Sequence, residues 1–192
     1  MNNCGFSEEK AKAIEANYHE LYKVSDQWVE DKLTQAVKNG YVTCAFGLKL
    51  RTPILAQIMA NSTNIPFIAQ KERRSAGNAV SGQSYGLLTT RAGIAFQERC
   101  LASEYCYDIL PVAHIHDAIY LLIRDKPEVV KWVNDTLIEC MSWQDLPELK
   151  HESIKITSGL EIYWPNWANA IEIPNNVTKQ ELMNIAKQAK EK

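Results

Sequence analysis

The spacing of apolar residues near the start of the chain is that of amphipathic helices. The first predicted helix covers residues 7–23, where Ser7 can cap the N-terminus ahead of two glutamates. One face of it carries Ala11, Ile14, Tyr18 and Leu21. A second helix is predicted from Ser25 to Lys38, because the following Asn39-Gly40 pair is a typical C-terminal signal.

The middle of the chain combines a short hairpin with a long helical stretch. Apolar runs on either side of Gly47 predict a hairpin over residues 41–52. A helix is predicted over residues 69–103, although it contains four glycines, each costing about 1 kcal/mol relative to alanine. The glycines therefore indicate either a break in the helix or a close approach of another backbone or of a ligand.

The second half of the chain alternates strands with helices. Residues 108–123 predict two buried strands joined by a tight turn at His116-Asp117. A helix from Pro127 to Ser142 follows, then a strand pair formed by residues 154–156 and 160–163. A polar helix over residues 178–192 is expected to pack weakly. Helices grouped on one side of an antiparallel sheet predict an α+β fold.

Composition and cysteine usage narrow the class of protein. The 192 residues suit one domain with a small appendage, and 46% of them are hydrophobic, as in ordinary globular proteins. No apolar run is long enough to span a bilayer, and the N-terminus shows no secretory signal. Five cysteines without a C-x-x-C pair suit neither a zinc site nor a disulfide framework. We therefore expect a cytoplasmic protein with no membrane partner.

Charge is unevenly distributed along the chain. The net charge is −2, which by itself argues against a nucleic-acid binder. Residues 41–100, however, contain seven lysines and arginines against two glutamates, so the remainder carries −7. This basic stretch fits either a footprint for phosphates or an ordinary solvated surface.

The first candidate for chemistry is the segment His114-Ile115-His116-Asp117, which lies between two apolar strands. A rigid hairpin would hold the Asp117 carboxylate in place, as metal binding requires. Three interpretations stay open: a structural turn capped by Asp117, a hydrolytic His/Asp metal centre using both histidines, or a magnesium-binding carboxylate for phosphoryl transfer.

The second candidate is the polar segment Arg73 to Gln83 on the long helix. Arg74 and Asn78 are four residues apart and are therefore neighbours on one helix face. Such donors suit the minor groove, where every base pair presents similar acceptors. A solvated polar face is the competing interpretation.

These motifs together resemble the C-terminal palm of family A (DNA polymerase I-like) DNA polymerases, in the style of T5-like phages. Arg74 and Asn78 match an Arg-x-x-x-Asn stretch on a long palm helix, and His116-Asp117 matches a His-Asp pair on a hairpin. The stretch GYVTCAFGLKLRTP matches the preceding hairpin, and Asn166-Trp167 matches the terminal segment. The resemblance covers roughly residues 5 to 170.

The resemblance implies a fold and a set of roles. The fold would be part of a polymerase palm, with a catalytic β-hairpin in an antiparallel sheet packed by long helices. Asp117 would be a catalytic carboxylate binding Mg²⁺ in a two-metal site, and His116 would position the primer terminus. Contacts with primer–template DNA would come from Arg74, Asn78, Gln83 and Arg73.

The chain departs from the family pattern in three ways. Ala118 stands where the family commonly has Glu, and Gly82 precedes Gln83 where the family has Gln before Gly, four residues after Asn. Because five residues separate two side chains that the family presents four apart, we predict that the helix is broken or widened by one residue, as in a π-bulge, between Asn78 and Gln83. The family's second catalytic Asp and its nucleotide-binding Lys helix have no match.

The resemblance therefore implies a fragment that is inactive alone. An N-terminal polymerase polypeptide would supply the missing carboxylate and the contacts to deoxynucleotides. Residues 1–40 would form helices at the fingers/palm junction, residues 41–173 the C-terminal palm, and residues 174–192 a polar tail helix. The alternatives are a non-catalytic DNA-binding module or remnant with a polymerase-like palm, and a His/Asp metallohydrolase.

Overall fold

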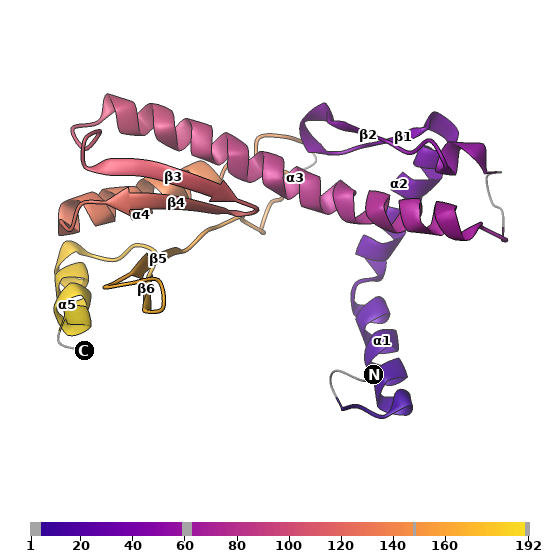
Figure 1. The fold of residues 1–192 in the computed structure, drawn as a ribbon, viewed down its shortest axis with the longest axis horizontal. Helices are drawn as coiled ribbons and strands as arrows, with labels where there is room; N and C mark the ends of the chain where they lie inside the picture. Colours follow the sequence, from indigo (N-terminus) through magenta and orange to yellow (C-terminus); the bar gives the residue numbers. More distant parts are fainter. Residues whose placement is uncertain (1–4, 59–62, 148, 191–192) are drawn as a thin grey trace. The chain divides into compact units, whose positions relative to one another are not determined.

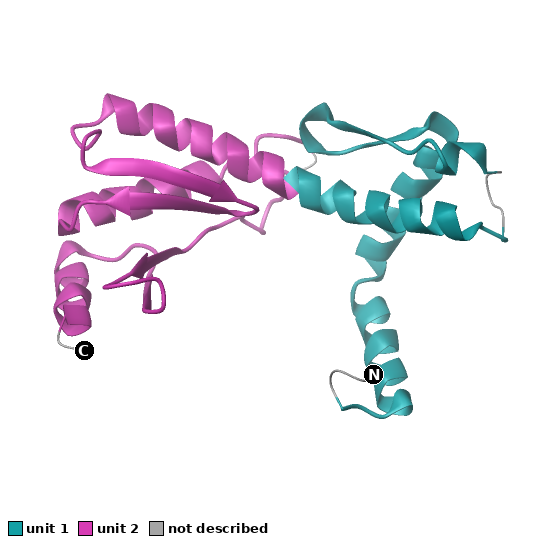
Figure 2. Ribbon diagram, viewed as in Figure 1, with its two compact units in different colours: residues 1–84 teal, residues 85–192 magenta. Residues whose placement is uncertain are grey.

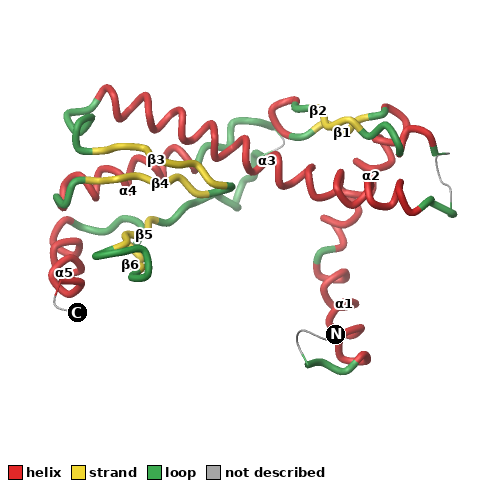
Figure 3. The backbone as a smooth tube through the Cα atoms, in the orientation of Figure 1, coloured by secondary structure: helices red, strands yellow, loops and turns green. Residues whose placement is uncertain are grey.

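The computed structural model describes residues 5–58, 63–147 and 149–190 and shows an α+β chain (Figure 1). Helices alternate with short strands along the chain (Figure 3), and the strands form three separate two-stranded antiparallel sheets. The α+β expectation is confirmed at this level. Among the described residues, no helix has the length and apolarity that would suffice to cross a membrane.

The chain forms two compact units (Figure 2), residues 1–84 and residues 85–192, which we call unit 1 and unit 2. The boundary lies inside the long helix α3 (Phe67–Ala102), between Ser84 and Tyr85. The functional segments predicted from the sequence, residues 1–40, 41–173 and 174–192, divide the chain at other positions. That division stays a prediction.

Unit 1 begins with α1 (Glu8–Leu21) and α2 (Lys23–Asn39), close to the predicted bounds. The Ser7 hydroxyl accepts a hydrogen bond from the Lys10 amide at 3.3 Å, as the capping pattern predicts. Gly40 ends α2 at φ 73°, a left-handed conformation that glycine adopts without steric cost, and its N–H donates to the Ala36 carbonyl.

A hairpin follows α2 and completes the core of unit 1. It consists of β1 (Tyr41–Thr43) and β2 (Lys49–Arg51), paired in register and joined by a 3₁₀ turn over Ala45–Gly47. A second 3₁₀ turn, Leu55–Gln57, follows. The buried side chains that join these elements to α2 and to the first half of α3 are Leu33, Ala36, Val42, Leu55, Ala69, Ala76 and Val80.

Unit 2 surrounds the second half of α3 with a longer hairpin and a helix. The hairpin is β3 (Ile109–Ile115) with β4 (Ala118–Ile123), and the helix is α4 (Pro127–Met141). Their shared core contains Ala92, Phe96, Cys100, Ile109, Val129, Val133, Cys140 and Met141. The hairpin, its turn and the start of α4 at Pro127 confirm the sequence predictions.

The prediction that both strands of this hairpin are buried is wrong. Ile109 is buried and its partner Ile123 packs on the core, but the next pair, Leu110 and Leu122, is 58% and 62% exposed. Successive side chains on a strand point to opposite faces. The helices cover one face of this two-stranded sheet, so the other face keeps its apolar side chains in solvent.

The last strands pair differently from the prediction. β5 (Leu160–Tyr163) pairs with β6 (Ala170–Ile173), and residues 154–156 form no strand. The side chain of Gln144 forms hydrogen bonds with the backbone of that segment instead. Its amide donates to the Ile154 carbonyl at 3.3 Å and accepts from the Ile156 N–H at 3.1 Å. Gln144, which follows the end of α4 at Met141, thus supplies the hydrogen bonds that a strand partner would provide.

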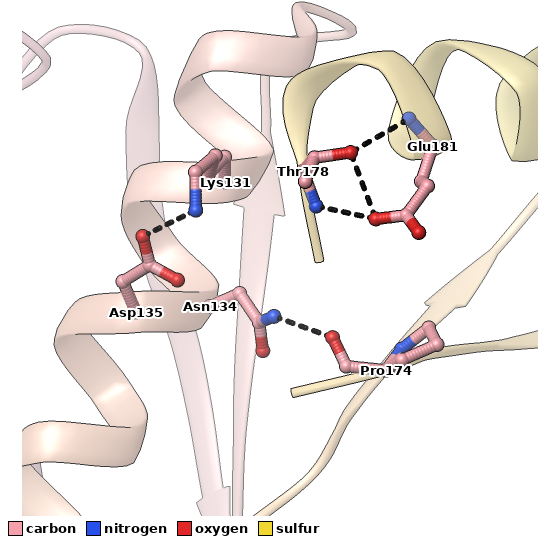
Figure 4. Close-up of polar contacts among 6 residues, drawn as sticks. All are labelled: Lys131, Asn134, Asp135, Pro174, Thr178 and Glu181. Carbon is pink, nitrogen blue, oxygen red and sulfur yellow. Dashed lines mark hydrogen bonds and ion pairs between the residues drawn. The ribbon is translucent and has the colours of Figure 1, made fainter. Parts of the chain in front are cut away.

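The terminal helix α5 (Lys179–Lys190) is anchored rather than weakly packed. Leu182 is buried in a small cluster with Ile173 and Val177, and Lys179 pairs with Glu128 of α4. Figure 4 shows the start of this helix, where Thr178 and Glu181 exchange hydrogen bonds in a capping box, and where Asn134 of α4 donates to the Pro174 carbonyl at 3.2 Å. The predicted residues 191–192 of this helix lie outside the described residues.

The glycines of α3 do not break the helix, which is continuous from Phe67 to Ala102. A Cβ at Gly77 would lie 3.5 Å from the Val29 side chain, and one at Gly93 would lie 3.5 Å from the Ile119 side chain, both ordinary contact distances. The predicted break is therefore wrong, and close approach of another backbone or of a ligand stays a prediction.

Candidate catalytic hairpin and nucleic-acid face

Asp117 lies at the tip of the β3–β4 hairpin. The last pair of the ladder is Ile115 with Ala118, so His116 and Asp117 form a two-residue turn between them. His116 has φ 55°, in the left-handed region where histidine is several-fold enriched among non-glycine residues. Both side chains are exposed, which confirms that Asp117 lies in a turn that solvent can reach.

The turn geometry removes the basis for a metal centre built from His114 and His116. That interpretation requires both histidines to lie on one strand and to point the same way. β3 ends at Ile115, however, and His116 belongs to the turn. Within the described ranges, no group of three or more His, Cys, Asp or Glu side chains could hold a metal ion.

The donors around Asp117 do not fit a complete two-metal magnesium site. Mg²⁺ prefers octahedral oxygen ligands, including one or two carboxylates. The tip of the hairpin contributes the single carboxylate of Asp117, and Ala118 next to it has no donor. The hairpin tip by itself therefore supplies one of the carboxylates that a two-metal site would need.

Asp117 also lines a cavity of about 530 Å³ within unit 2. The polar side chains of its wall include Tyr85, Tyr120, Glu161 and Glu172, and its apolar wall comes from β4, α4 and Leu160. The sequence interpretation did not find Glu161 and Glu172. The strand containing Glu161 was predicted over residues 160–163, but its partner was predicted as residues 154–156, so the sequence did not bring Glu161 and Glu172 together.

An aromatic cluster places the terminal segment beside the hairpin. The Trp167 ring lies 5.2 Å from the Tyr120 ring of β4 and 5.4 Å from the Tyr163 ring of β5, measured between centroids. Offset aromatic pairs at such distances add about 0.5–1.5 kcal/mol beyond the area that they bury. Trp167 therefore links β4 to β5 in the unit that contains Asp117.

The second candidate site is the outward face of α3 in unit 1. Arg74 and Asn78 are both exposed, four residues apart on a regular helix, so they share a face as predicted. That face is opposite to the one that buries Ala76 and Val80. Neither side chain has a protein partner among the described residues, so both are available to a ligand.

Arg73 is engaged elsewhere in unit 1. Its guanidinium donates to the carboxylate of Glu30 on α2 and forms an ion pair with it. The neighbouring positions 73 and 74 are rotated by about 100° around the helix axis. The structure thus separates the two arginines, one paired with α2 and one facing solvent.

The predicted widening of α3 between Asn78 and Gln83 is wrong. The helix is α-helical through this stretch, so five residues rotate Gln83 about 140° away from Asn78. Gln83 instead follows Ala76 and Val80 on the core-facing side, although it is exposed beyond the end of that core. Gln83 therefore does not share the Arg74 face, and its contact with DNA remains a prediction.

Asp117 and Arg74 belong to different units. Asp117 lies in unit 2, and Arg74 with Asn78 lies in unit 1. The expectation that all three face one cleft remains a prediction. No family model matches the chain, and no match was found among curated proteins.

Proposed function

We propose that this chain is the C-terminal part of a DNA-directed DNA polymerase that works together with an N-terminal polypeptide. The observation that carries the proposal is the position of Asp117 in an exposed two-residue turn of a hairpin held by α3 and α4. This is the arrangement that the resemblance to family A polymerases implies for a catalytic His-Asp pair. Template-directed nucleotidyl transfer is the reaction in which the assembled complex would act.

Each candidate residue has a role in this proposal. Asp117 offers one carboxylate to a site whose Mg²⁺ ions, once bound, would stabilise charge on the transferring phosphoryl group. His116, next to it in the turn, orients the primer terminus. Arg74 and Asn78 donate hydrogen bonds to minor-groove acceptors of the primer–template duplex, which makes their contact independent of sequence.

The proposal also requires the chain to be inactive alone. The family's second catalytic Asp and its nucleotide-binding Lys have no counterpart in this sequence. One carboxylate cannot hold two divalent ions, and binding of the incoming deoxynucleotide would depend on the N-terminal polypeptide. Activity is therefore expected only in the complex.

The proposal expects an N-terminal polymerase polypeptide encoded next to this chain, and reconstitution of the chain with that polypeptide tests it. Purified together, the two should extend a primer with magnesium and deoxynucleotides, whereas each alone should not. Asp117→Asn should abolish extension. Asp145→Asn serves as the matched control, because Asp145 is an exposed carboxylate of unit 2 outside the hairpin. Extension by the purified chain alone would refute the need for a partner.

A non-catalytic DNA-binding module or remnant is the second candidate. The observation that favours it is that Arg74 and Asn78 are exposed and free for DNA, while the described residues offer one carboxylate at the hairpin tip. This function predicts binding of primer–template duplex by the chain together with no extension in any complex. The same reconstitution experiment separates the two candidates.

A further inference from the structure

The strand β4 of unit 2 has a neighbouring strand on one side only. It forms a two-stranded sheet with β3 (Figure 1). Among the described residues, no backbone hydrogen bond joins β4 to a segment other than β3. An edge strand presents a row of N–H and C=O groups that can pair with another chain. The outer edge of β4 is therefore open to main-chain hydrogen bonding.

The hydrogen-bonding pattern of the hairpin identifies the open groups. In an antiparallel pair, rungs that exchange hydrogen bonds alternate with rungs that do not. The Arg124 N–H donates to the Asp108 carbonyl at 2.8 Å, so this rung is a bonded one, and every second residue of β4 points its main-chain groups away from β3. These residues are Ile119, Leu121 and Ile123. Pro111, the partner of Leu121, agrees with this assignment because it has no N–H to donate.

The cavity of unit 2 runs along this edge. Its wall includes residues 118–121 without a gap, followed by Ile123. Successive side chains on a strand point to opposite faces, so a cavity that touches successive residues lies at the edge of the strand. All three residues with outward-pointing main-chain groups line it. A row of such groups at strand spacing matches another extended main chain.

The other edge of the hairpin is less suited to pairing. β3 contains Pro111, and its register with β4 shifts between Pro111 and Ala113, as in a β-bulge. Proline and bulges are features that protect edge strands from pairing. The sequence of β4, AIYLLI, contains neither proline nor a charged residue. This asymmetry marks β4 as the accepting edge.

The size of the cavity selects a single strand. With about 3.4 Å per residue, about 4.8 Å between strands and about 10 Å between layers, three or four residues of a strand fill roughly 500–650 Å³. The cavity measures about 530 Å³. It therefore accommodates one strand. The β4 strand of a second copy fits less well, because its own β3 accompanies it.

The walls of the cavity define the side chains of this strand on one face. Leu121, whose main chain points outward, packs in the same core cluster as Leu137 and Met141 of α4. Leu137 and Met141 also line the cavity. Side chains of paired residues lie on the same face of a sheet. The side chains opposite Leu121 and its alternate neighbours should therefore be apolar.

Charge complementarity defines the opposite face. Tyr120 contacts Trp167, which stacks on Tyr163. The Tyr163 hydroxyl donates to the Glu161 carboxylate at 2.7 Å, so negative charge lies on the Tyr120 side of β4. The lining also contains Glu172, and the described residues contribute no Lys, Arg or His to it. Basic side chains suit this face, and acidic ones do not.

We propose that the free edge of β4 binds an extended segment of another polypeptide, which joins the sheet as a third strand. The main chain of that segment pairs with Ile119, Leu121 and Ile123. Its side chains alternate, apolar toward α4 and basic toward Glu161. The added hydrogen bonds would stabilise the hairpin that carries Asp117.

Titration of the full chain with acetyl-Val-Lys-Val-Lys-Val-amide tests the site. The peptide should slow amide exchange at Ile119, Leu121 and Ile123, followed residue by residue by NMR, by about tenfold or more at saturation. The same peptide with an N-methyl group on its central valine should bind about tenfold more weakly or worse, because that nitrogen no longer donates. Its side chains and charge are unchanged. Equal binding of the two peptides, or no binding of either, would overturn the proposal.

Two further measurements test the kind of partner. Acetyl-Val-Glu-Val-Glu-Val-amide should bind about tenfold more weakly than the lysine peptide, and equal binding would refute the charge complementarity. Amide exchange of the chain alone should not depend on its concentration. Protection of the three β4 amides on concentrating the chain would assign the edge to a second copy and contradict the proposal.

Proline substitutions at one rung of the hairpin provide a matched pair of variants. Ile119 and His114 are partners in a rung without mutual hydrogen bonds, so neither substitution removes a bond between β3 and β4. Ile119→Pro should weaken binding of the lysine peptide by about tenfold or more, because it removes a donor from the β4 edge. His114→Pro removes a donor from the β3 edge and should leave binding unchanged. Equal effects of the two would refute the choice of edge.

The N-methylated peptide keeps the proposal testable with the unmodified chain, even if Ile119→Pro fails to fold. Primer extension enters none of these measurements, so this site and the proposed polymerase function can fail separately.

Discussion

The two units of this chain differ in charge and in the kind of site that they offer. Unit 1 contains ten lysines and arginines against eight acidic residues, whereas unit 2 contains eleven against fifteen. The candidate groups of unit 1 are the cationic and amide donors of Arg74 and Asn78, and those of unit 2 are carboxylates around a cavity. The two units therefore differ in the sign of their net charge, positive in unit 1 and negative in unit 2.

The units also differ in how fully their helices are packed. None of the residues of α1, all of them described, is buried, and its apolar face exposes Ile14, Tyr18 and Leu21. α4 of unit 2 has six buried residues in a chain segment of similar length. Helix stability in proteins comes mainly from packing of an apolar face. Perturbations of the core should therefore affect unit 2 more than they affect α1.

The largest expected effect is that of replacing Asp117, the carboxylate at the tip of the β3–β4 hairpin in unit 2. Asp117→Asn in the reconstituted complex should lower the rate of primer extension by about a thousandfold or more, equal to about 4 kcal/mol of transition-state stabilisation. Single-nucleotide extension under saturating deoxynucleotide measures it. A residual rate within about tenfold of the unmodified complex would remove Asp117 from the chemistry.

The next largest effect concerns the core of unit 2. Phe96 is buried, with its ring 5.8 Å from that of Trp132, and Phe96→Ala should destabilise unit 2 by about 3–5 kcal/mol. Amide hydrogen exchange should show the loss in α4 and in β4. Exchange in α1 should stay as fast as in the unmodified chain, and faster exchange there after the substitution would contradict the contrast in packing.

The neighbouring arginines of α3 test the nucleic-acid face of unit 1. Arg74→Lys should slow extension by about tenfold, because lysine lacks the planar donors that reach groove acceptors, while the salt dependence of DNA binding stays nearly unchanged. Arg73→Lys is the matched control and should have a smaller effect, since Arg73 is paired with Glu30. Equal extension by the two variants would show that the exposed position has no special role.

The smallest expected effect is a pH dependence of the stability that the His19–Asp26 pair gives to unit 1. The hydrogen bond of His19 to the Asp26 carboxylate, at 2.7 Å, raises the pKa of His19 above 6.5. A raised folded-state pKa means that the stabilisation is fully present below about pH 6.5 and is lost as the pH rises through the folded value. Asp26 and Glu15 are the carboxylates that act on this ring.

Histidine ring resonances recorded across the titration should give His19 a pKa above that of a free histidine, and Asp26→Asn should return it to the ordinary value. Hydrogen exchange at the α1–α2 junction should be slower in mildly acidic buffer than at alkaline pH, after correction for the intrinsic rate. Identical pH profiles of the unmodified chain and Asp26→Asn would show that the pair contributes nothing.

Local signals in the sequence predicted most of the helices and the β3–β4 hairpin. Ser7, Gly40 and Pro127 act through their own backbone and capping chemistry, so the ends that they specify depend little on the rest of the fold. The turn at His116-Asp117 is likewise local, because adjacent apolar strands leave little choice of register. Hence the position of Asp117 at an exposed tip could be predicted.

Contacts between distant segments decided what the sequence could not. The Gln144 side chain takes the hydrogen bonds of residues 154–156, so β5 pairs with β6, and that pairing places Glu161 opposite Glu172. Which strands pair with each other therefore depends on groups that are far apart in the sequence.

The sequence by itself therefore determined the α+β class, the helix ends and the exposed tip carrying Asp117, since these depend on neighbouring residues. The tertiary structure alone decided that α3 runs unbroken through its glycines, that Arg73 pairs with Glu30, and that a cavity in unit 2 is lined by acidic side chains. The physical reason is that packing and charge pairing depend on which surfaces meet, and spacing along the chain does not specify that.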